Sequence, residues 1–149
     1  MNRITTWISA ALIAAVSLLS QPLLAEQLVA HGEYEIHYNA FNSTFIQPDV
    51  AQKVGISRSK RKALVNVSVL KVNGDQKTAV SAVVTGKATN LIQQSQEIRF
   101  NKVDEGDAIY YLGEFGFTDD QVIRLALEVQ PDPNQPAFNV AFEQKFYEE

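Results

Sequence analysis

The chain contains no cysteine among its 149 residues. This absence excludes disulfide bonds, thiolate metal sites and the lipid-modified cysteine of a bacterial lipoprotein. Small exported domains often depend on disulfides because their cores are small. A domain built from this sequence must therefore be stabilised by the burial of apolar side chains alone.

Residues for the common catalytic sites are also scarce. The sequence has only two histidines, no Gly-x-Ser-x-Gly motif and no glycine-rich loop of the kind that cradles phosphate. The acidic residues Asp104, Glu105 and Asp107 lack the full run of oxygen ligands of a calcium loop, and they are typical of a turn. We therefore expect a protein that is not an enzyme, with no catalytic residues, no cofactor and no metal site.

Basic residues are the minority charge, with 13 Lys and Arg against 17 Asp and Glu. Residues 1–25 carry a single charge, Arg3, so the remaining 12 basic and 17 acidic residues give residues 26–149 a net charge of −5. This balance provides no positive field for a phosphate backbone and argues against a nucleic-acid partner.

The first 25 residues have the layout of a secretory signal peptide. Arg3 precedes an apolar run over residues 8–19, Pro22 interrupts the run, and the small residue Ala25 offers a cleavage point. The alternative is an uncleaved membrane anchor, but the run is shorter than the roughly 20 apolar residues that span a bilayer. We predict a signal peptide over 1–25 and one periplasmic domain over 26–149, without a stable membrane anchor.

Apolar residues alternate with polar ones along most of residues 26–149, which indicates strands. The predicted strands cover residues 33–39, 63–72, 77–88, 96–103, 108–117, 123–130 and 138–146. Pro48 and Gly55 bracket a helix of one or two turns over residues 50–54, and Asn73-Gly74 indicates a hairpin. About seven strands at regular spacing predict an all-β protein, a single immunoglobulin-like antiparallel β-sandwich.

Two segments are candidates for an interaction surface. One is the aromatic and polar stretch after the first strand, and the other is a short basic loop; their residues are Asn39, Phe41, Asn42, Phe45, Arg58, Lys60, Arg61 and Lys62. Each has a purely structural alternative. Phe41 and Phe45 would plug the end of the sandwich while Asn42 bonds to backbone, and the basic loop would be a solvated loop whose charges discourage aggregation.

A row of alternate residues, His31, Glu33, Glu35 and His37, has the spacing that projects side chains to one face of a strand. Such a row would suit a metal ion. A solvated strand face explains the same pattern, and we favour that interpretation because metal sites usually draw ligands from several elements.

The stretch from His37 to Phe45, followed by Arg58-Ser59-Lys60 and the strand from Ala63 to Lys71, resembles a bacterial envelope family catalogued as domain of unknown function 4426. The resemblance covers most of residues 27–147. It implies a small exported β-sandwich of Gram-negative bacteria and carries no catalytic residues with it. We expect a protein-binding module of the cell envelope; the alternative is a small-molecule or metal-binding periplasmic domain.

Overall fold

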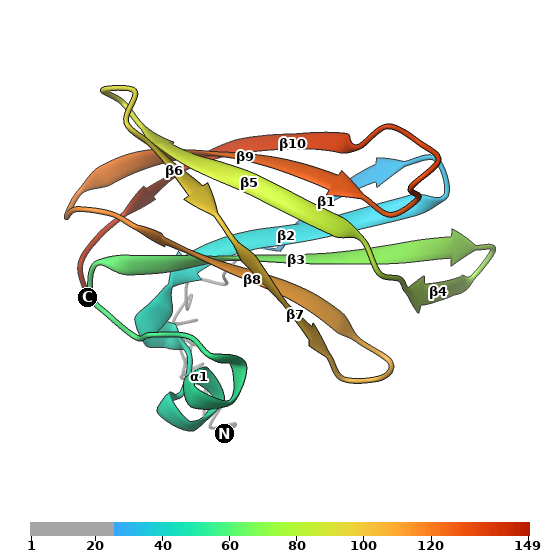
Figure 1. Ribbon diagram of the computed structural model, residues 1–149, viewed down its shortest axis with the longest axis horizontal. Coiled ribbons are helices and arrows are strands. Elements are labelled where there is room, and N and C mark those ends of the chain that lie inside the picture. Colours follow the sequence, from blue (N-terminus) through green and yellow to red (C-terminus); the bar gives the residue numbers. More distant parts are fainter. Residues whose placement is uncertain (1–25) are drawn as a thin grey trace, which may run out of the picture.

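The computed structural model describes residues 26–149, and the predicted signal peptide over residues 1–25 lies outside the described part of the chain. Ten strands form two antiparallel sheets (Figure 1). The strands are β1 (Gln27–His31), β2 (Tyr34–Asn42), β3 (Lys62–Asn73), β4 (Gln76–Ala79), β5 (Val83–Asn90), β6 (Ser95–Ile98), β7 (Phe100–Asp104), β8 (Ile109–Gly116), β9 (Gln121–Gln130) and β10 (Phe138–Phe146). A 3-10 turn, η1 (Ser43–Phe45), and a short helix, α1 (Pro48–Val54), connect β2 to β3.

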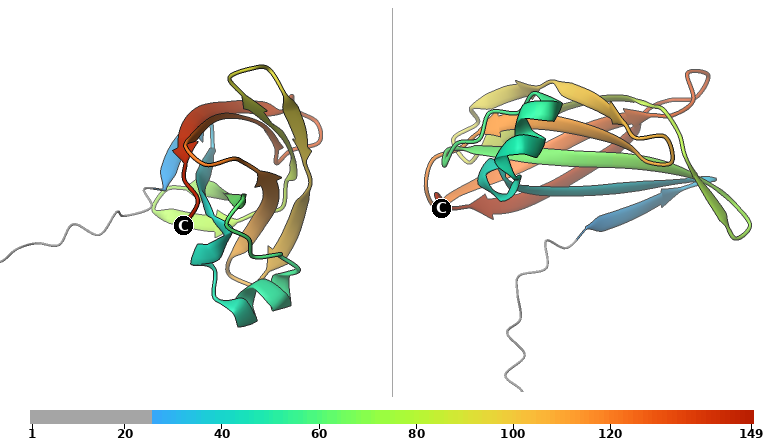
Figure 2. Two further views of the ribbon diagram at one scale, coloured as in Figure 1. Left: turned by 90° about the vertical axis from the view of Figure 1, so that its left-hand side faces the viewer. Right: turned by 90° about the horizontal axis from the view of Figure 1, so that it is seen from below.

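The larger sheet has the strand order β1-β2-β3-β8-β7, and β4 pairs with the end of β3 that β8 does not reach. The smaller sheet has the order β10-β9-β5-β6. The two sheets face each other across the core, and α1 lies outside the larger sheet (Figure 2). The all-β architecture with two antiparallel sheets is confirmed, whereas assignment to the immunoglobulin-like class remains a prediction.

The core lies between the sheets and is filled by the alternate side chains that the sequence pattern indicates. Ile36 on β2, Val67 on β3 and Leu127 on β9 are buried, as are the aromatic rings of Phe115 and Phe146, which meet edge to face at 5.3 Å. The β9–β10 hairpin is confirmed in its antiparallel pairing. Burial of this kind is the main favourable term in folding, at roughly 25 cal/mol per Å² of apolar surface.

The count of about seven strands was too low, because the strands predicted over 77–88 and 96–103 are each two strands in different sheets. The chain crosses from β4 to β5 through residues 80–82 and from β6 to β7 at Arg99. Val80, Ala82 and Val84 keep the same inward alternation through the first crossing. Alternation alone therefore gives no sign of the change of sheet. The edge strand β1 was not predicted.

Two glycines allow side chains to pack closely against a strand, Gly113 between the two sheets and Gly86 within the smaller sheet. A Cβ on Gly113 would lie 2.3 Å from the Ile98 side chain, and one on Gly86 would lie 2.8 Å from Leu127. Gly86 pairs regularly with both neighbouring strands, so it marks neither a bulge nor a bend. The absence of a Cβ at Gly86 lets the Leu127 side chain approach the strand closely. Close approach is one of the common reasons for glycine within a strand.

Candidate functional site

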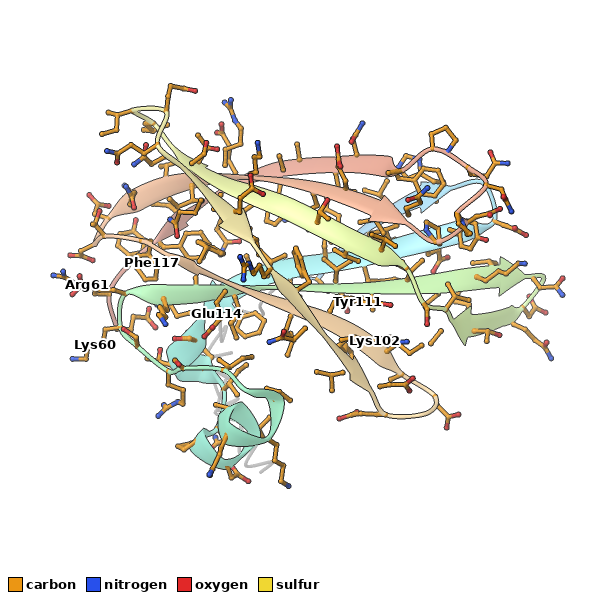
Figure 3. All side chains as sticks on the ribbon, viewed as in Figure 1. Lys60, Arg61, Lys102, Tyr111, Glu114 and Phe117 are labelled. Carbon is orange, nitrogen blue, oxygen red and sulfur yellow. The ribbon has the colours of Figure 1, made fainter. Side chains whose placement is uncertain are left out.

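Both candidate surfaces lie at one end of the sandwich, which we call the loop end. The end of β2, the start of β3, the β8–β9 turn and the chain after β10 all meet there, and the β5–β6 hairpin projects from the same end (Figure 1). Lys60 and Arg61 lie at this end, and Phe117 lies between the sheets behind them (Figure 3). The topology therefore gathers segments that are far apart in the sequence into one surface.

The segment after β2 is held to its neighbours by buried polar side chains. Asn42 is 6% exposed, and its Nδ2 donates a hydrogen bond of 2.7 Å to the carbonyl oxygen of Tyr147. Ser43 is fully buried; its Oγ donates to the carbonyl oxygen of Ser59 and accepts from the Ser59 N–H, both at 2.9 Å. These bonds tie together the end of β2, the basic loop and the C-terminal segment.

The two phenylalanines of this segment differ in exposure. Phe41 is half-buried and packs with Leu64 against Ala51 of α1 in a second apolar cluster outside the larger sheet. Phe45 is 51% exposed and does not plug the end of the sandwich. Asn39 is half-buried on β2 and points away from the core, as the alternation of that strand requires. Phe45 is thus the member of this segment that offers most apolar surface to a partner.

Two of the four cationic side chains of the basic loop make local contacts. The Arg58 guanidinium donates to the carbonyl oxygen of Thr44 at 3.0 Å, and Arg61 Nε donates to Glu148 at 2.8 Å. Lys60 is exposed, whereas Lys62 is half-buried at the start of β3. Only part of the predicted positive charge is therefore presented to solvent without a neighbouring acid.

The most exposed apolar residues of the loop end were missed by the sequence analysis. Leu91 and Ile92, which we call the tip, connect β5 to β6 and are 70% and 74% exposed. Two adjacent aliphatic residues between two predicted strands were the available indication. The alternation of apolar and polar residues does not reveal them, because the residues that connect two strands are expected to be polar.

The turn that carries the tip is rigidly built. Asn90 Oδ1 accepts hydrogen bonds from the backbone N–H groups of Ile92 and Gln94, at 3.1 and 2.9 Å. The Asn90 N–H donates to the Gln94 carbonyl, and Gln93 adopts a positive φ of 65°. An asparagine side chain that binds backbone two residues ahead is a common turn device. These hydrogen bonds hold the turn in a defined conformation, so binding of a partner to the tip would cost little conformational entropy.

A groove of about 350 Å³ runs beside the tip and is lined by the β8–β9 turn and Lys145. Asp119 and Asp120 belong to that turn, and Asp120 pairs with Lys145 Nζ at 2.7 Å. The hydrogen bond from Lys145 to Asp120 raises the pKa of this lysine above its ordinary value of 10.5. Tyr147, 49% exposed, extends the same surface beneath Lys145.

The predicted histidine and carboxylate row forms only in part: Glu35 and His37 contact each other on one face of β2, whereas His31 does not join them. The β1–β2 hairpin turns His31 to the core side, where its ring stacks on Phe138 at 4.5 Å. His37 instead lies between Glu26 and Glu35, at 3.1 and 3.2 Å. Within residues 26–149 no three His, Cys, Asp or Glu side chains are grouped to hold a metal ion.

Comparison with known proteins places the chain among relatives of unknown activity. The family model described as Domain of unknown function (DUF4426) matches residues 28–149. A crystal structure of a DUF4426 family protein, PA0388 from Pseudomonas aeruginosa PAO1, is 33% identical, with a TM-score of 0.71; the match covers 83% of this chain and 96% of that one. No curated protein matches the chain.

Two further solved structures share the fold alone. FetP of uropathogenic Escherichia coli strain F11, expressed recombinantly in the periplasm, is 14% identical with a TM-score of 0.60, over 83% of this chain and 94% of that one. A copper-bound variant of FetP is 14% identical with a TM-score of 0.56, over 80% and 93%. In the described part of the chain no helix is long and apolar enough to cross a membrane.

Proposed function

The chain belongs to the DUF4426 family, whose description names no activity. From the surface of the chain itself, we propose that it is a non-catalytic periplasmic domain that binds a protein partner through the loop end. The observation that carries this proposal is the tip. Leu91 and Ile92 hold more than two-thirds of their surface in solvent on a turn that is rigid without any partner. Adjacent exposed aliphatic residues on a projecting hairpin are typical of an interaction site.

The tip suits binding for an energetic reason. Burying a leucine or isoleucine contributes about 1.5–3 kcal/mol, and a preorganised turn keeps most of that gain because little conformational entropy is lost. Tyr147 and Phe45 add aromatic surface at the same end. Aromatic and aliphatic anchors surrounded by polar groups are the usual composition of a protein interface.

Charge favours a protein over a lipid surface as the partner. The groove beside the tip is lined by the carboxylates of Asp119 and Asp120, and Lys145 is already paired with Asp120. Anionic lipids would be repelled by this rim, since membrane-surface segments are rich in Lys and Arg. A partner with an apolar pocket and basic flanks would complement the tip and the groove beside it.

The cellular location rests on the N-terminal sequence. The charged, apolar and small-residue layout of residues 1–25 supports export through a cleaved signal peptide. FetP, whose fold is shared, was expressed in the periplasm. The copper of the FetP variant is not carried over, because a likeness at 14% identity concerns the fold alone.

The test is a double substitution, Leu91→Ser with Ile92→Ser, in the native host envelope. Loss of two aliphatic side chains that the partner would bury should weaken partner capture by at least about a hundredfold, while the melting temperature stays at the wild-type value. Val83→Ser is the matched control, since Val83 is 62% exposed at the opposite end of β5.

Three outcomes contradict the proposal. Equal capture of the same proteins by both variants would show that the tip is not the anchor. Loss of vesicle binding together with no change in protein capture would make the tip a membrane contact. Conversion of a dimer to a monomer by the double substitution, with no other partner affected, would make it a self-association site.

A further inference from the structure

The larger sheet has a free edge at β1, on the side away from β7 (Figure 2). β1 pairs with β2 along one side only, and within residues 26–149 its backbone bonds to the backbone of no other segment. The N–H and C=O groups that point away from β2 therefore have no partner strand in this part of the chain. Such a row of backbone groups is a template for pairing with another strand.

The other free edges of the two sheets are protected against pairing. Gln144 Nε2 donates a 2.9 Å hydrogen bond to the Ala40 carbonyl and so closes the part of β2 that extends beyond β1. The edge strands β4, β6, β7 and β10 carry charged side chains, namely Lys77, Glu97, Lys102, Asp104, Glu143 and Lys145. β1 contains no Lys, Arg, Asp, Glu or Pro, so it lacks the features that usually protect an edge strand.

β1 also exposes apolar surface on the outer face of the sheet. Leu28 is 53% exposed, and Ala30, two residues further along the same face, is exposed as well. Val29 points to the opposite face, where it is half-buried against the main core. The strand thus places a large aliphatic side chain beside a small one along an uncharged edge.

We propose that β1 pairs antiparallel with β1 of a second copy of this chain, about a twofold axis at Val29. In this register all five residues of β1 are paired, and Leu28 lies opposite Ala30 of the second copy. Each Leu28 side chain covers that small residue and reaches the other Leu28 diagonally, because diagonal neighbours on one face are about 7–8 Å apart. The twofold axis makes the contact self-complementary.

Charge favours a second copy as the occupant of this edge. Residues 26–149 carry a net charge of −5, so two copies approach best where no charge lies opposite its own kind. In the twofold register no pair within β1 joins like charges, and Glu26 lies opposite Gly32 of the second copy. An uncharged edge gives no electrostatic selectivity for an acidic or basic segment of another protein, whereas Leu28 and Ala30 fit the same strand reversed.

The pairing joins the two larger sheets into one continuous sheet. The paired strands run in opposite directions, so the loop ends of the two copies point away from each other. The pairing itself is independent of the proposed function. Given that function, the dimer presents one tip at each end and holds two partner molecules apart instead of gripping one molecule twice.

Sedimentation velocity of the protein purified from the envelope, over a wide range of concentrations, tests the proposal. We expect a reversible equilibrium between monomer and dimer, because five residue pairs form a small interface. Leu28→Lys should weaken dimerisation by at least about tenfold, since lysine on an edge strand opposes pairing. The melting temperature should stay at the wild-type value, because Leu28 is half exposed.

Leu91→Lys is the matched control, the same change on an exposed leucine of the tip. It should leave the dimer unchanged and, under the proposed function, weaken partner capture. Leu28→Lys should show the reverse, with capture retained and the dimer weakened. The two variants therefore separate a failure of the pairing from a failure of the proposed function.

Oxidative crosslinking tests the register, because the chain contains no cysteine of its own. Val29→Cys should crosslink two copies, since residues directly opposite in antiparallel strands have Cα atoms roughly 4.5–5.5 Å apart, within the range of a disulfide. Gln27→Cys should not crosslink. In the proposed register Gln27 lies opposite His31 of the second copy, four residues away from the other Gln27.

The proposal is overturned by a monomer at every concentration, by a dimer that survives Leu28→Lys, or by a dimer that Leu91→Lys removes. Equal crosslinking of Val29→Cys and Gln27→Cys would overturn the twofold pairing about Val29. A monomer that retains an extended peptide from the envelope, and loses it in Leu28→Lys, would make this edge the site of a partner's strand instead.

Discussion

Asn42→Ala is the substitution that best tests how the loop end is held together. Asn42 ends β2, is 6% exposed, and donates its 2.7 Å hydrogen bond to a carbonyl 105 residues later in the chain. The alanine removes the donor and leaves the Tyr147 carbonyl without this partner. The neighbouring bonds between Ser43 and Ser59 remain, so the effect should stay local.

The expected cost follows from the burial of this hydrogen bond. A neutral hydrogen bond contributes about 0.5–1.5 kcal/mol net, and a buried group left unpaired adds a desolvation penalty, giving a total of about 1–3 kcal/mol. For a domain of this size, each kcal/mol corresponds to a fall of roughly 4 °C in melting temperature. Phe41 packing against α1 is unaffected, because the substitution removes only the amide.

Thermal and urea denaturation would measure this cost, with Asn139→Ala as the control. Asn139 is exposed on β10, so its replacement should change stability by less than about 0.5 kcal/mol. Deleting residues 147–149 removes the acceptor, and in that background Asn42→Ala should cost markedly less. Melting of Asn42→Ala at the wild-type temperature, with weakened partner capture, would show that Asn42 serves recognition and that our structural account of it is wrong.

Three further predictions concern packing and charge. Leu127→Ala should cost about 2–5 kcal/mol through lost burial and a cavity, whereas Glu128→Ala on the wet face should change stability by less than about 0.5 kcal/mol; equal unfolding midpoints in urea would refute the assignment of faces. Gly113→Ala should destabilise by about 1–3 kcal/mol, since its methyl group would overlap a packed aliphatic side chain; an unchanged melting curve would contradict this overlap. The hydrogen bond from Lys77 lowers the pKa of Glu35 below 4.5, so Glu35 contributes stability above pH 4.5 and loses it as pH falls through the lowered value; Glu35→Gln should therefore be less stable than wild type at neutral pH and match it in acid.

The strands were largely predictable because one face of each packs on the core. β9 and β10 follow the expected alternation, and the helix bounded by Pro48 and Gly55 forms as predicted, with Gly55 in the left-handed conformation. The sheet changes at residues 80–82 and at Arg99 were not predictable from periodicity. Inward alternation continues through both crossings, so they are decided by which strands pair, a tertiary property.

The candidate site was predictable only in part. The sequence indicated the segment around Asn42 and the basic loop, but not that Ser43 and Ser59 bind one another across 16 residues. It gave no weight to Leu91, because an apolar residue in a connection is indistinguishable from a strand residue until the pairing is known.

The most direct test of the central claim is site-specific photocrosslinking in the native envelope, with the reactive group placed at position 92 and, separately, at position 83. We expect a defined protein adduct from position 92 that Leu91→Ser removes, and no such adduct from position 83. Identical adducts from both positions, or an adduct from position 92 that survives Leu91→Ser unchanged, would contradict a partner anchored on the tip.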